Sequence, residues 1–245
     1  MPRFYIEPKF WDPNHLVLNG DEFHHCVNVL RLECGDQIVI FNGKGEEITA
    51  IIKSISKEEI QLKSQSHIQS EKLKTRICIG QAVPKGKNMD LIIEKSTELG
   101  AAEIYPIISE RTIIRLNEKE GLKKREKWQR VAIEACKQSG QNWLPLVNPP
   151  QNLKKLFESV FNKFDLIVIA SLQDDSQHFK KILSEFQENG PNSVLILIGP
   201  EGDFTPSEIN FAIDAGSKPM SLGPITLRSE TAAIYSLSVA AHELL

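Results

Sequence analysis

Residues 193–209, SVLILIGPEGDFTPSEI, join an apolar run to an acidic turn bounded by glycines. Residues 194–198 are all apolar, which predicts a buried strand. Residues 205–208, Thr-Pro-Ser-Glu, have the form of a capping box with proline at the first helical position. The cap explains those four residues but gives no structural reason for Gly-Pro-Glu-Gly-Asp at 199–203.

The rest of the C-terminal part alternates in the same way. Strand-like segments at 77–83, 103–108 and 165–170 alternate with helical segments at 87–99, 122–139, 179–186, 206–215 and 230–244, and Gly100 is expected to end the first of these helices. The alternation predicts a mostly parallel sheet with helices on both faces, over a domain of residues 73–245. Ligands of such sheets bind beyond the carboxyl ends of the strands, so residues 199–203 are a candidate binding turn.

The N-terminal part is rich in short strands. Extended segments are predicted at 3–6, 15–18, 37–41, 46–55 and 58–66, with a turn at 42–47 in which Gly43 and Gly45 provide positive φ. One helix is predicted over 21–32, with Phe23, Val27 and Leu30 on one face. These elements indicate a small β-barrel-like domain of residues 1–72, followed by a polar linker at 67–75.

The composition is that of a globular protein: 245 residues, 41% hydrophobic and 25% charged. The absence of a long apolar run or a signal-peptide start predicts a cytoplasmic protein. The four cysteines form no CxxC pair and are expected to be reduced core thiols, and His24-His25 is expected to be a helix surface plus one packed imidazole rather than a metal site.

Net charge varies along the chain. The whole chain carries −3, but residues 73–150 carry +5, against −3 for residues 1–72 and −5 for residues 151–245. A polyanion such as RNA responds to the local surplus. Within it, basic residues crowd the helix at 122–139, where Trp128, Val131, Ala132 and Ala135 recur at core spacing. A solvated helix face is the alternative reading of that pattern.

A second turn resembles the first. Residues 221–233, SLGPITLRSETAA, contain another Leu-Gly-Pro and lead into an alanine-rich helix. Ser229 is predicted to be the N-cap of that helix, and Glu230 suits the positive end of its dipole. Neither role accounts for Arg228 in a turn that follows a strand.

LIGPEGDF (197–204) and SLGPITLRSETAA together resemble the paired motifs of the RsmE-type ribosomal RNA methyltransferases of the SPOUT superfamily. HHCVNVLRL (24–32), PKGKNMDLIIEKSTELGAAEIYPIISERT (84–112) and RVAIEACKQSGQNWLPLV (130–147) are similar to further blocks of that family. Two positions depart from the pattern: Asp203 replaces a glycine and Gln141 an arginine. Asp tolerates left-handed backbone, so the turn is expected to persist.

The resemblance implies a PUA-like β-barrel RNA-binding domain, and a SPOUT α/β domain with a deep trefoil knot whose cofactor-binding part spans about 195–245. It implies a homodimer that transfers a methyl group from S-adenosyl-L-methionine to N3 of a uridine in 16S rRNA, as naked RNA or in the assembled small subunit. The cofactor-binding residues that it implies are Ile169, Ala170, Leu197, Gly199, Pro200, Glu201, Gly202, Leu222, Gly223, Leu227, Arg228, Thr231 and Ala232.

The chemistry requires the N3 proton of uridine to leave before nitrogen attacks. We expect Arg228 to hold the uridine or its phosphate, and Glu230 to orient Arg228 or assist the proton, with Glu201 as the alternative base. RNA contacts are expected at Arg3, Arg31, Lys85, Lys87, Arg111 and Arg115, although Arg31 could instead cap its helix.

Two other functions remain open on the sequence alone. One is an α/β enzyme that grips phosphate with the first turn, although the chain has no GxxxxGK[ST] or GxGxxG motif. The other is an RNA-binding or ribosome-assembly protein without turnover. The last helix is apolar around much of its circumference, which fits either a dimer interface or the core of one protomer.

Overall fold

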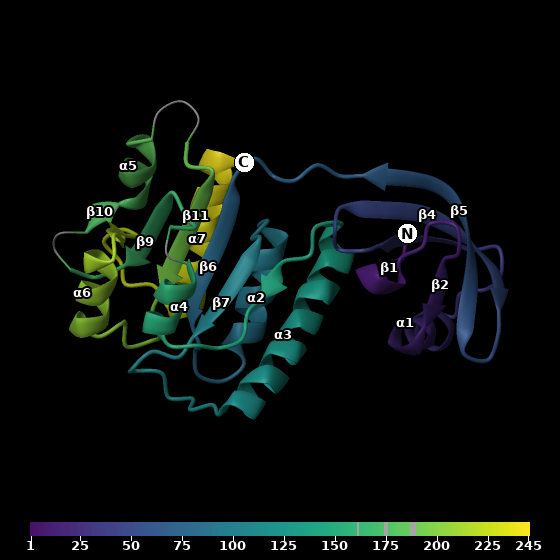
Figure 1. Cartoon of the computed structure of the whole chain (residues 1–245), viewed down its shortest axis with the longest axis horizontal. Helices are drawn as coiled ribbons and strands as arrows, with labels where there is room; N and C mark the ends of the chain where they lie inside the picture. The colour runs from purple at the N-terminus through teal and green to yellow at the C-terminus, as the bar shows by residue number, and fades with distance from the viewer. Residues whose placement is uncertain (161, 174–175, 187–189) are drawn as a thin grey trace. The chain divides into compact units, whose positions relative to one another are not determined.

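The computed structural model describes residues 1–160, 162–173, 176–186 and 190–245 (Figure 1). The chain forms two compact units. Unit 1 comprises residues 1–72 and 133–144, and unit 2 comprises residues 73–132 and 145–245. Helix α3 (Glu118–Ser139) therefore begins in unit 2 and ends in unit 1. The second segment of unit 1 was not predicted from the sequence.

Unit 1 contains a five-stranded sheet of order β1-β3-β4-β5-β2. β1 pairs with β3 in parallel, and the other pairs are antiparallel, with two register shifts between β4 and β5. Such shifts bend and twist a strand pair, which helps a small sheet to curl around one core. The strands are β1 (Arg3–Tyr5), β2 (Val17–Asn19), β3 (Gln37–Phe41), β4 (Glu46–Ile55) and β5 (Glu59–Gln69).

The five predicted strands are confirmed, and Gly43 and Gly45 have positive φ as expected. The predicted linker is wrong at its start, because β5 continues to Gln69. Residues 63–69 of β5 are all exposed, and all but Ile68 are polar, so the sequence pattern there could not be distinguished from that of a linker. A short 3-10 helix, η1 (Pro8–Phe10), precedes β2.

The predicted helix over 21–32 is interrupted. α1 (Gly20–His24) continues as wider π-type turns, η2 (His25–Val29), and Arg31 then adopts a φ of 56°. The wider turns rotate the following residues relative to an α-helix. As a result, Phe23 and Val27 pack on the core as predicted, but Leu30 is 40% exposed and Leu32 packs instead.

The histidine pair lies as predicted, and the cysteine prediction is partly corrected. His24 is exposed and bonds Asn28 through its Nδ1 (2.9 Å), while the His25 ring contacts Phe4 edge-on. All four cysteines are free thiols, as expected, and three of them are buried. Cys34 is exposed, so the prediction that all four are core thiols is wrong.

Unit 2 contains a seven-stranded sheet of order β10-β12-β9-β11-β6-β7-β8, and every pair is parallel. This confirms the parallel α/β prediction. The strands are β6 (Arg76–Ala82), β7 (Glu103–Ile107), β8 (Leu146–Val147), β9 (Leu166–Ala170), β10 (Gln177–His178), β11 (Ser193–Ile198) and β12 (Lys218–Ser221). The trefoil knot stays a prediction.

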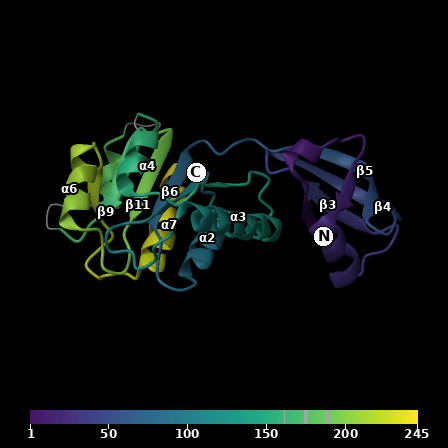
Figure 2. The same ribbon diagram turned by 60° about the horizontal axis from the view of Figure 1, so that its bottom comes forward.

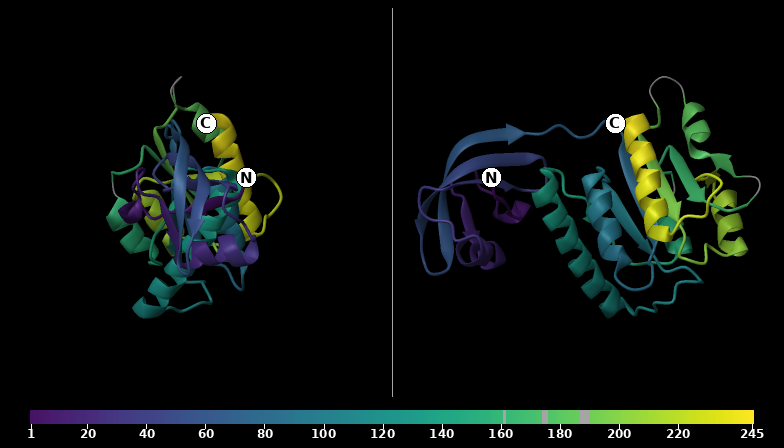
Figure 3. Two further views of the ribbon diagram at one scale, coloured as in Figure 1. Left: turned by 90° about the vertical axis from the view of Figure 1, so that its right-hand side faces the viewer. Right: turned by 180° about the vertical axis from the view of Figure 1, so that it is seen from behind.

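Helices cover both faces of this sheet (Figure 2). α4 and α6 lie on one face, and α2 and α7 on the other, where Figure 3 shows α7 beside β6 and α2. The helices are α2 (Asn88–Glu98), α4 (Leu153–Val160), α5 (Phe179–Ser184), α6 (Pro206–Asp214) and α7 (Ser229–Leu244), together with the unit 2 part of α3.

Helix α4 was not predicted from the sequence. Its buried residues are Leu153, Leu156, Phe157 and Val160, a spacing of three, four and seven that is typical of a helix with one buried face. The pattern was available in the sequence, but only eight residues carry it, so it is easily overlooked. Of the residues predicted at core spacing in α3, Trp128, Ala132 and Ala135 are buried and Val131 is half-buried.

β11 occupies the centre of unit 2, between β9 and β6. Its residues from Val194 to Ile198 are at most 1% exposed, which confirms the buried strand predicted from the opening stretch. Among the described residues, no helix is both long and apolar enough to cross a membrane.

Close packing in the centre of the sheet gives a first prediction. A Cβ at Gly80 of β6 would lie 2.5 Å from Leu197 Cδ2 and 3.2 Å from Ile107 Cδ1, whereas at Gly121 of α3 it would meet only Pro150, at 3.6 Å. Gly80→Ala should therefore lower the free energy of unfolding by about 1–3 kcal/mol through overpacking. Gly121→Ala, the matched control, should raise it by about 0.5–1 kcal/mol through helix propensity. Urea unfolding of both variants checks this, and equal effects would contradict it.

Candidate active site

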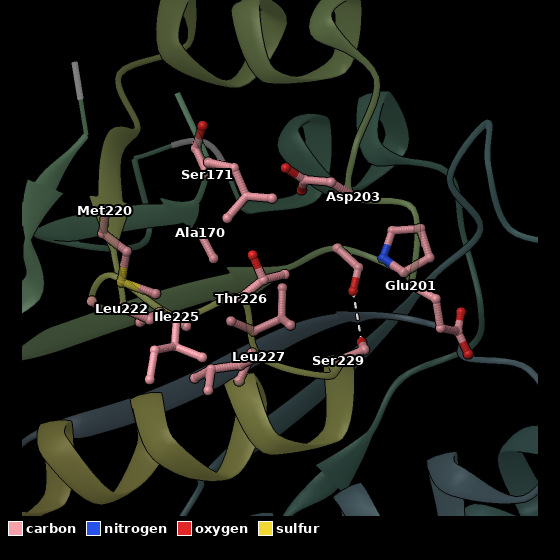
Figure 4. Close-up of a pocket in the computed structure, with 16 residues that line it drawn as sticks. Ala170, Ser171, Glu201, Asp203, Met220, Leu222, Ile225, Thr226, Leu227 and Ser229 are labelled. Carbon is pink, nitrogen blue, oxygen red and sulfur yellow. Dashed lines mark hydrogen bonds between the residues drawn. The ribbon is translucent and has the colours of Figure 1, made fainter. Parts of the chain in front are cut away.

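A pocket lies at the carboxyl ends of β9, β11 and β12, where the two glycine-bounded turns meet (Figure 4). Its lining comprises residues 170–172 from the end of β9, residues 198–201 and 203 from the end of β11 and the turn beyond it, and residues 220, 222–223 and 225–227 from β12 and the turn that follows. Ser229 and Ala232 of α7 complete it. This is the edge of a parallel sheet where ligands bind in α/β proteins.

The pocket includes eight of the thirteen predicted cofactor residues, namely Ala170, Gly199, Pro200, Glu201, Leu222, Gly223, Leu227 and Ala232. The other five lie close by in the chain. Ile169 and Leu197 are fully buried within β9 and β11, while Gly202, Arg228 and Thr231 are exposed neighbours of lining residues. Their binding roles stay predictions.

The first turn is held in shape from within. The predicted capping box is present: Thr205 and Glu208 bond each other's backbone N–H groups, at 2.9 Å and 3.3 Å. Upstream of the cap, a Cβ on Gly199 would lie 2.9 Å from Asp203 Oδ1 and 3.0 Å from the Phe204 nitrogen, so the turn requires glycine there. Asp203 has a φ of 61°, which confirms that the turn tolerates Asp in the left-handed region.

A buried hydrogen-bonded bridge joins the two turns. The Ser229 hydroxyl donates to the Gly199 carbonyl (2.7 Å) and accepts from the Gln81 side-chain amide (2.9 Å). Arg228 occupies the N-cap position of α7, so the prediction that Ser229 caps this helix is wrong. The hydroxyl instead satisfies a carbonyl of the other turn, across a gap of 30 residues.

Two predicted RNA residues, Lys85 and Arg111, bind the first turn. Arg111 donates to the carbonyls of Gly202 (2.5 Å) and Phe204 (3.5 Å). The backbone N–H of Lys85 donates to Glu201 Oε1 (3.0 Å), and Figure 4 shows the Glu201 carboxylate turned away from the pocket. These contacts hold the turn from outside the pocket. The third predicted RNA residue of this region, Lys87, is exposed at the N-cap position of α2.

Asp203 contributes a carboxylate that points toward Ser171 (Figure 4). Its Oδ1 accepts from the Phe204 N–H (2.7 Å). Burial raises the pKa of this carboxyl above its usual value, and the N–H groups of Phe204 and Leu172 and the charge of Arg111 only partly oppose the rise. The ionised form is thus less favourable here than in water.

Arg228 and Glu230 lie at the start of α7. Arg228 is exposed, and within the described part of the chain its guanidinium makes no hydrogen bond or ion pair. The described residues also contain no ion pair between Arg228 and Glu230, so this structure does not show Glu230 orienting Arg228. Arg228 is therefore available to an external partner.

The two RNA predictions in unit 1 differ in outcome. The Arg3 guanidinium is largely buried: it bonds Glu47 (2.6 Å) and Asn142 (2.7 Å) and lies 4.9 Å from the centre of the Phe41 ring. These contacts give Arg3 a structural role within unit 1. Arg31 is exposed in its left-handed conformation just after the π-type turns, where residues commonly end a helix.

Ser171 lines the pocket at the end of β9, where the sequence predicts a third wall, but several other lining residues were not predicted: Leu172, Ile198, Asp203, Met220, Ile225, Thr226 and Ser229. Most of them adjoin a predicted residue in the chain, so the two turns and the end of β9 could have been taken as whole segments. Gln81 gave no such signal. It lies inside an apolar strand, and its role depends on a partner 148 residues away.

The bridge between the turns gives a second prediction. Ser229→Ala leaves the Gly199 carbonyl and the Gln81 amide without their partner, so it should lower the free energy of unfolding by about 1–3 kcal/mol. Ser236→Ala is the matched control, because that buried hydroxyl of α7 bonds only the carbonyl of Ala232 one turn earlier (2.7 Å). It should cost less than about 1 kcal/mol. Denaturant unfolding measures both, and a Ser229 effect no larger than that of Ser236 would argue against the bridge.

Comparison with known proteins finds a family model that matches each unit. A family model described as an RNA methyltransferase domain matches residues 71–241, and one described as an RNA methyltransferase PUA domain matches residues 18–63. The protein named ribosomal RNA small subunit methyltransferase E from Bacillus subtilis is 33% identical over 99% of this chain and 97% of its own length. Its namesake from Synechocystis is 32% identical over 96% of this chain and 76% of its own length.

Solved structures agree over the full chain. A putative methyltransferase from Legionella pneumophila, in complex with bound SAM, has a TM-score of 0.86 and 33% identity, and covers 97% of this chain and 95% of its own. Ribosomal RNA small subunit methyltransferase E from Neisseria gonorrhoeae, bound to S-adenosyl methionine, has a TM-score of 0.84 and 29% identity, with 99% and 97% covered. With its PUA-like first unit and its parallel α/β second unit, this chain belongs to the RsmE family of ribosomal RNA methyltransferases.

Proposed function

We propose that this protein transfers a methyl group from S-adenosyl-L-methionine to N3 of a uridine in 16S rRNA. The observation that carries the proposal is the pocket itself, in which turns more than twenty residues apart join at the carboxyl ends of three adjacent strands. Full-length similarity to small-subunit rRNA methyltransferases supports the reaction class, and the family resemblance supplies the target atom.

The pocket residues fit the proposed cofactor. Leu222, Ile225 and Leu227 form an apolar side that suits the faces of an adenine ring, and Ser171 and Asp203 lie apart from them, on the polar side (Figure 4). Gly223 has a φ of 115° and open space where a Cβ would lie, so its backbone can be approached closely. Residues of the second turn would therefore hold the adenosine of the cofactor. The first turn and Ser171 would hold its polar methionine part.

The bound cofactor supplies a methyl group already activated by its sulfonium. The protein must align the acceptor and exclude water. Arg228, exposed beside the pocket and without a partner among the described residues, is positioned to hold the uridine and to stabilise its ring once N3 has lost its proton. Glu230, half-exposed in the first turn of α7, is our candidate acceptor of that proton. Glu201 is the weaker candidate, because its carboxylate faces away from the pocket.

RNA is proposed to contact a basic cleft at the start of α3. Arg115, Lys123, Lys124 and Lys127 line this cleft together with Leu116 and Glu120. Lys127 also pairs with Asp90, which leaves Arg115 and the other two lysines as the principal phosphate ligands. The exposed side chains of Lys85 and Lys87 add to the positive charge of unit 2.

A homodimer completes the proposal. One face of α7 is buried against β6, β11 and α2, so packing within the protomer accounts for that face. Its other face carries Tyr235, which is 39% exposed, and the pocket rim carries Leu172 and Ile225, which are 69% and 74% exposed. Exposed apolar residues around a binding site favour cover by a second protein surface.

The deciding experiment incubates the protein with labelled S-adenosyl-L-methionine and small-subunit particles from cells that lack it, followed by a nucleoside digest. The proposal expects label in 3-methyluridine. A non-catalytic RNA-binding protein leaves the RNA unlabelled while still binding the particle. A phosphate-gripping enzyme is disfavoured by the acidic side chains of the first turn, and it would bind nucleoside triphosphates instead.

Loss of the free guanidinium gives a third prediction. Arg228→Ala should reduce methyl transfer at least about a hundredfold, because the charge that stabilises the uracil anion is removed. Thermal unfolding should stay near wild type, since the Arg228 guanidinium makes no hydrogen bond or ion pair with the described residues. Single-turnover labelling measures the effect, and near-normal turnover would remove Arg228 from the mechanism.

The basic cleft gives a fourth prediction. Replacing Lys123 and Lys124 by alanine should weaken rRNA binding and reduce the slope of log K against log salt by about 1.5, because two phosphate contacts are lost. The control replaces Lys154 and Lys155, two exposed lysines of α4, and should leave the slope unchanged. Filter binding between low and moderate salt measures both slopes. If they are the same, RNA does not bind in this cleft.

A further inference from the structure

Asp203 holds a special position among the residues that line the pocket. The charged side chains in that lining are Glu201 and Asp203, and both are acidic. Glu201 is bonded to the Lys85 N–H and turned outward, whereas the Asp203 carboxylate points inward toward Ser171 (Figure 4). Within the described lining, the pocket therefore presents one inward negative charge and no positive charge.

The Asp203 carboxylate is fixed in place. The backbone N–H of Asp203 donates to the Pro200 carbonyl (2.9 Å), and the carboxylate Oδ1 accepts from the Phe204 N–H (2.7 Å). Arg111 is the cation whose charge acts on Asp203, but it donates its hydrogen bonds to the carbonyls of Gly202 and Phe204. The carboxylate is thus oriented by backbone groups, while the guanidinium is occupied with the turn.

A half-buried anion of this kind is costly to keep ionised, and its raised pKa reflects that cost. A cation placed against it offsets the cost and gains a charge-assisted contact. The methyl donor and its product differ at one atom: the donor has a positive sulfonium, and the product S-adenosylhomocysteine has a neutral sulfide. An inward carboxylate can tell the two apart by charge alone.

We propose that Asp203 recognises the sulfonium charge of the cofactor and makes this pocket selective for the methyl donor over the demethylated product. This inference rests on the proposed function. Transfer of the methyl group removes the positive charge that the carboxylate holds, so Asp203 favours donor binding before the reaction and product release after it. Asp203 acts as a specificity-determining residue, and no covalent step involves it.

Isothermal titration calorimetry with S-adenosyl-L-methionine and S-adenosylhomocysteine tests the inference on the whole protein. Asp203→Asn keeps the size and the tolerance of left-handed backbone but removes the charge. It should weaken donor binding about tenfold and product binding less than about threefold, as expected for one charge-assisted contact. Asp203→Gly, which suits a φ of 61°, should give the same change in the ratio of affinities.

Asp214→Asn is the matched control, because it removes the same charge from an exposed position of α6. It should leave the affinity ratio unchanged. An equal loss for both ligands in the Asp203 variants would overturn the inference, since the carboxylate would then contact a group that they share, such as the ribose or the amino group. Unchanged affinities for both ligands would overturn it too. Failure of the wild-type protein to bind either ligand would overturn the proposed function as well, which separates the two cases.

Discussion

The hydrogen bond from the Ser229 hydroxyl to the Gly199 carbonyl is the constraint on which the pocket depends. A carbonyl can only accept, so the hydroxyl must donate to it, and its own oxygen must then accept from the Gln81 amide. The amide also donates to the Ala82 carbonyl (2.8 Å), which fixes its orientation. One buried relay thereby joins β6, the turn after β11 and the start of α7, and all three are needed to place the two turns face to face.

Hydrogen bonds from several elements hold the acidic first turn at the end of the sheet. Glu208 takes part in the capping box and also accepts from the Glu110 N–H (3.0 Å), which ties the loop after β7 to the start of α6. Arg111 follows in that same loop and binds the far side of the turn. The backbone of residues 199–204 is therefore preorganised before any ligand arrives, which lowers the entropy cost of binding.

Much of this architecture could be predicted from residue patterns. An apolar run that ends in Gly-Pro indicated β11 and a turn beyond it, and the repeated Leu-Gly-Pro indicated a second turn at a similar strand end. What could not be predicted is the set of polar partners. Gln81 lies 148 residues from Ser229 and sits among apolar residues, and Arg111 has the charge expected of an RNA ligand although it binds backbone. Local periodicity carries no information about such long-range pairing. It also did not indicate the π-type turns, because of which Leu32 rather than Leu30 packs on the core.

The central place of β11 has a consequence for how the protein is made. β11 pairs with β6 along one edge and with β9 along the other, yet both of these strands are synthesised before it. While the chain emerges from the ribosome, these edges have no strand to pair with, and unpaired edges are sites of wrong association. β9 joins the β6-β7-β8 part of the sheet only when residues 193–198 insert between β9 and β6, which are already present. The nascent enzyme therefore acquires its pocket among the last steps of folding, after most of the chain has been translated.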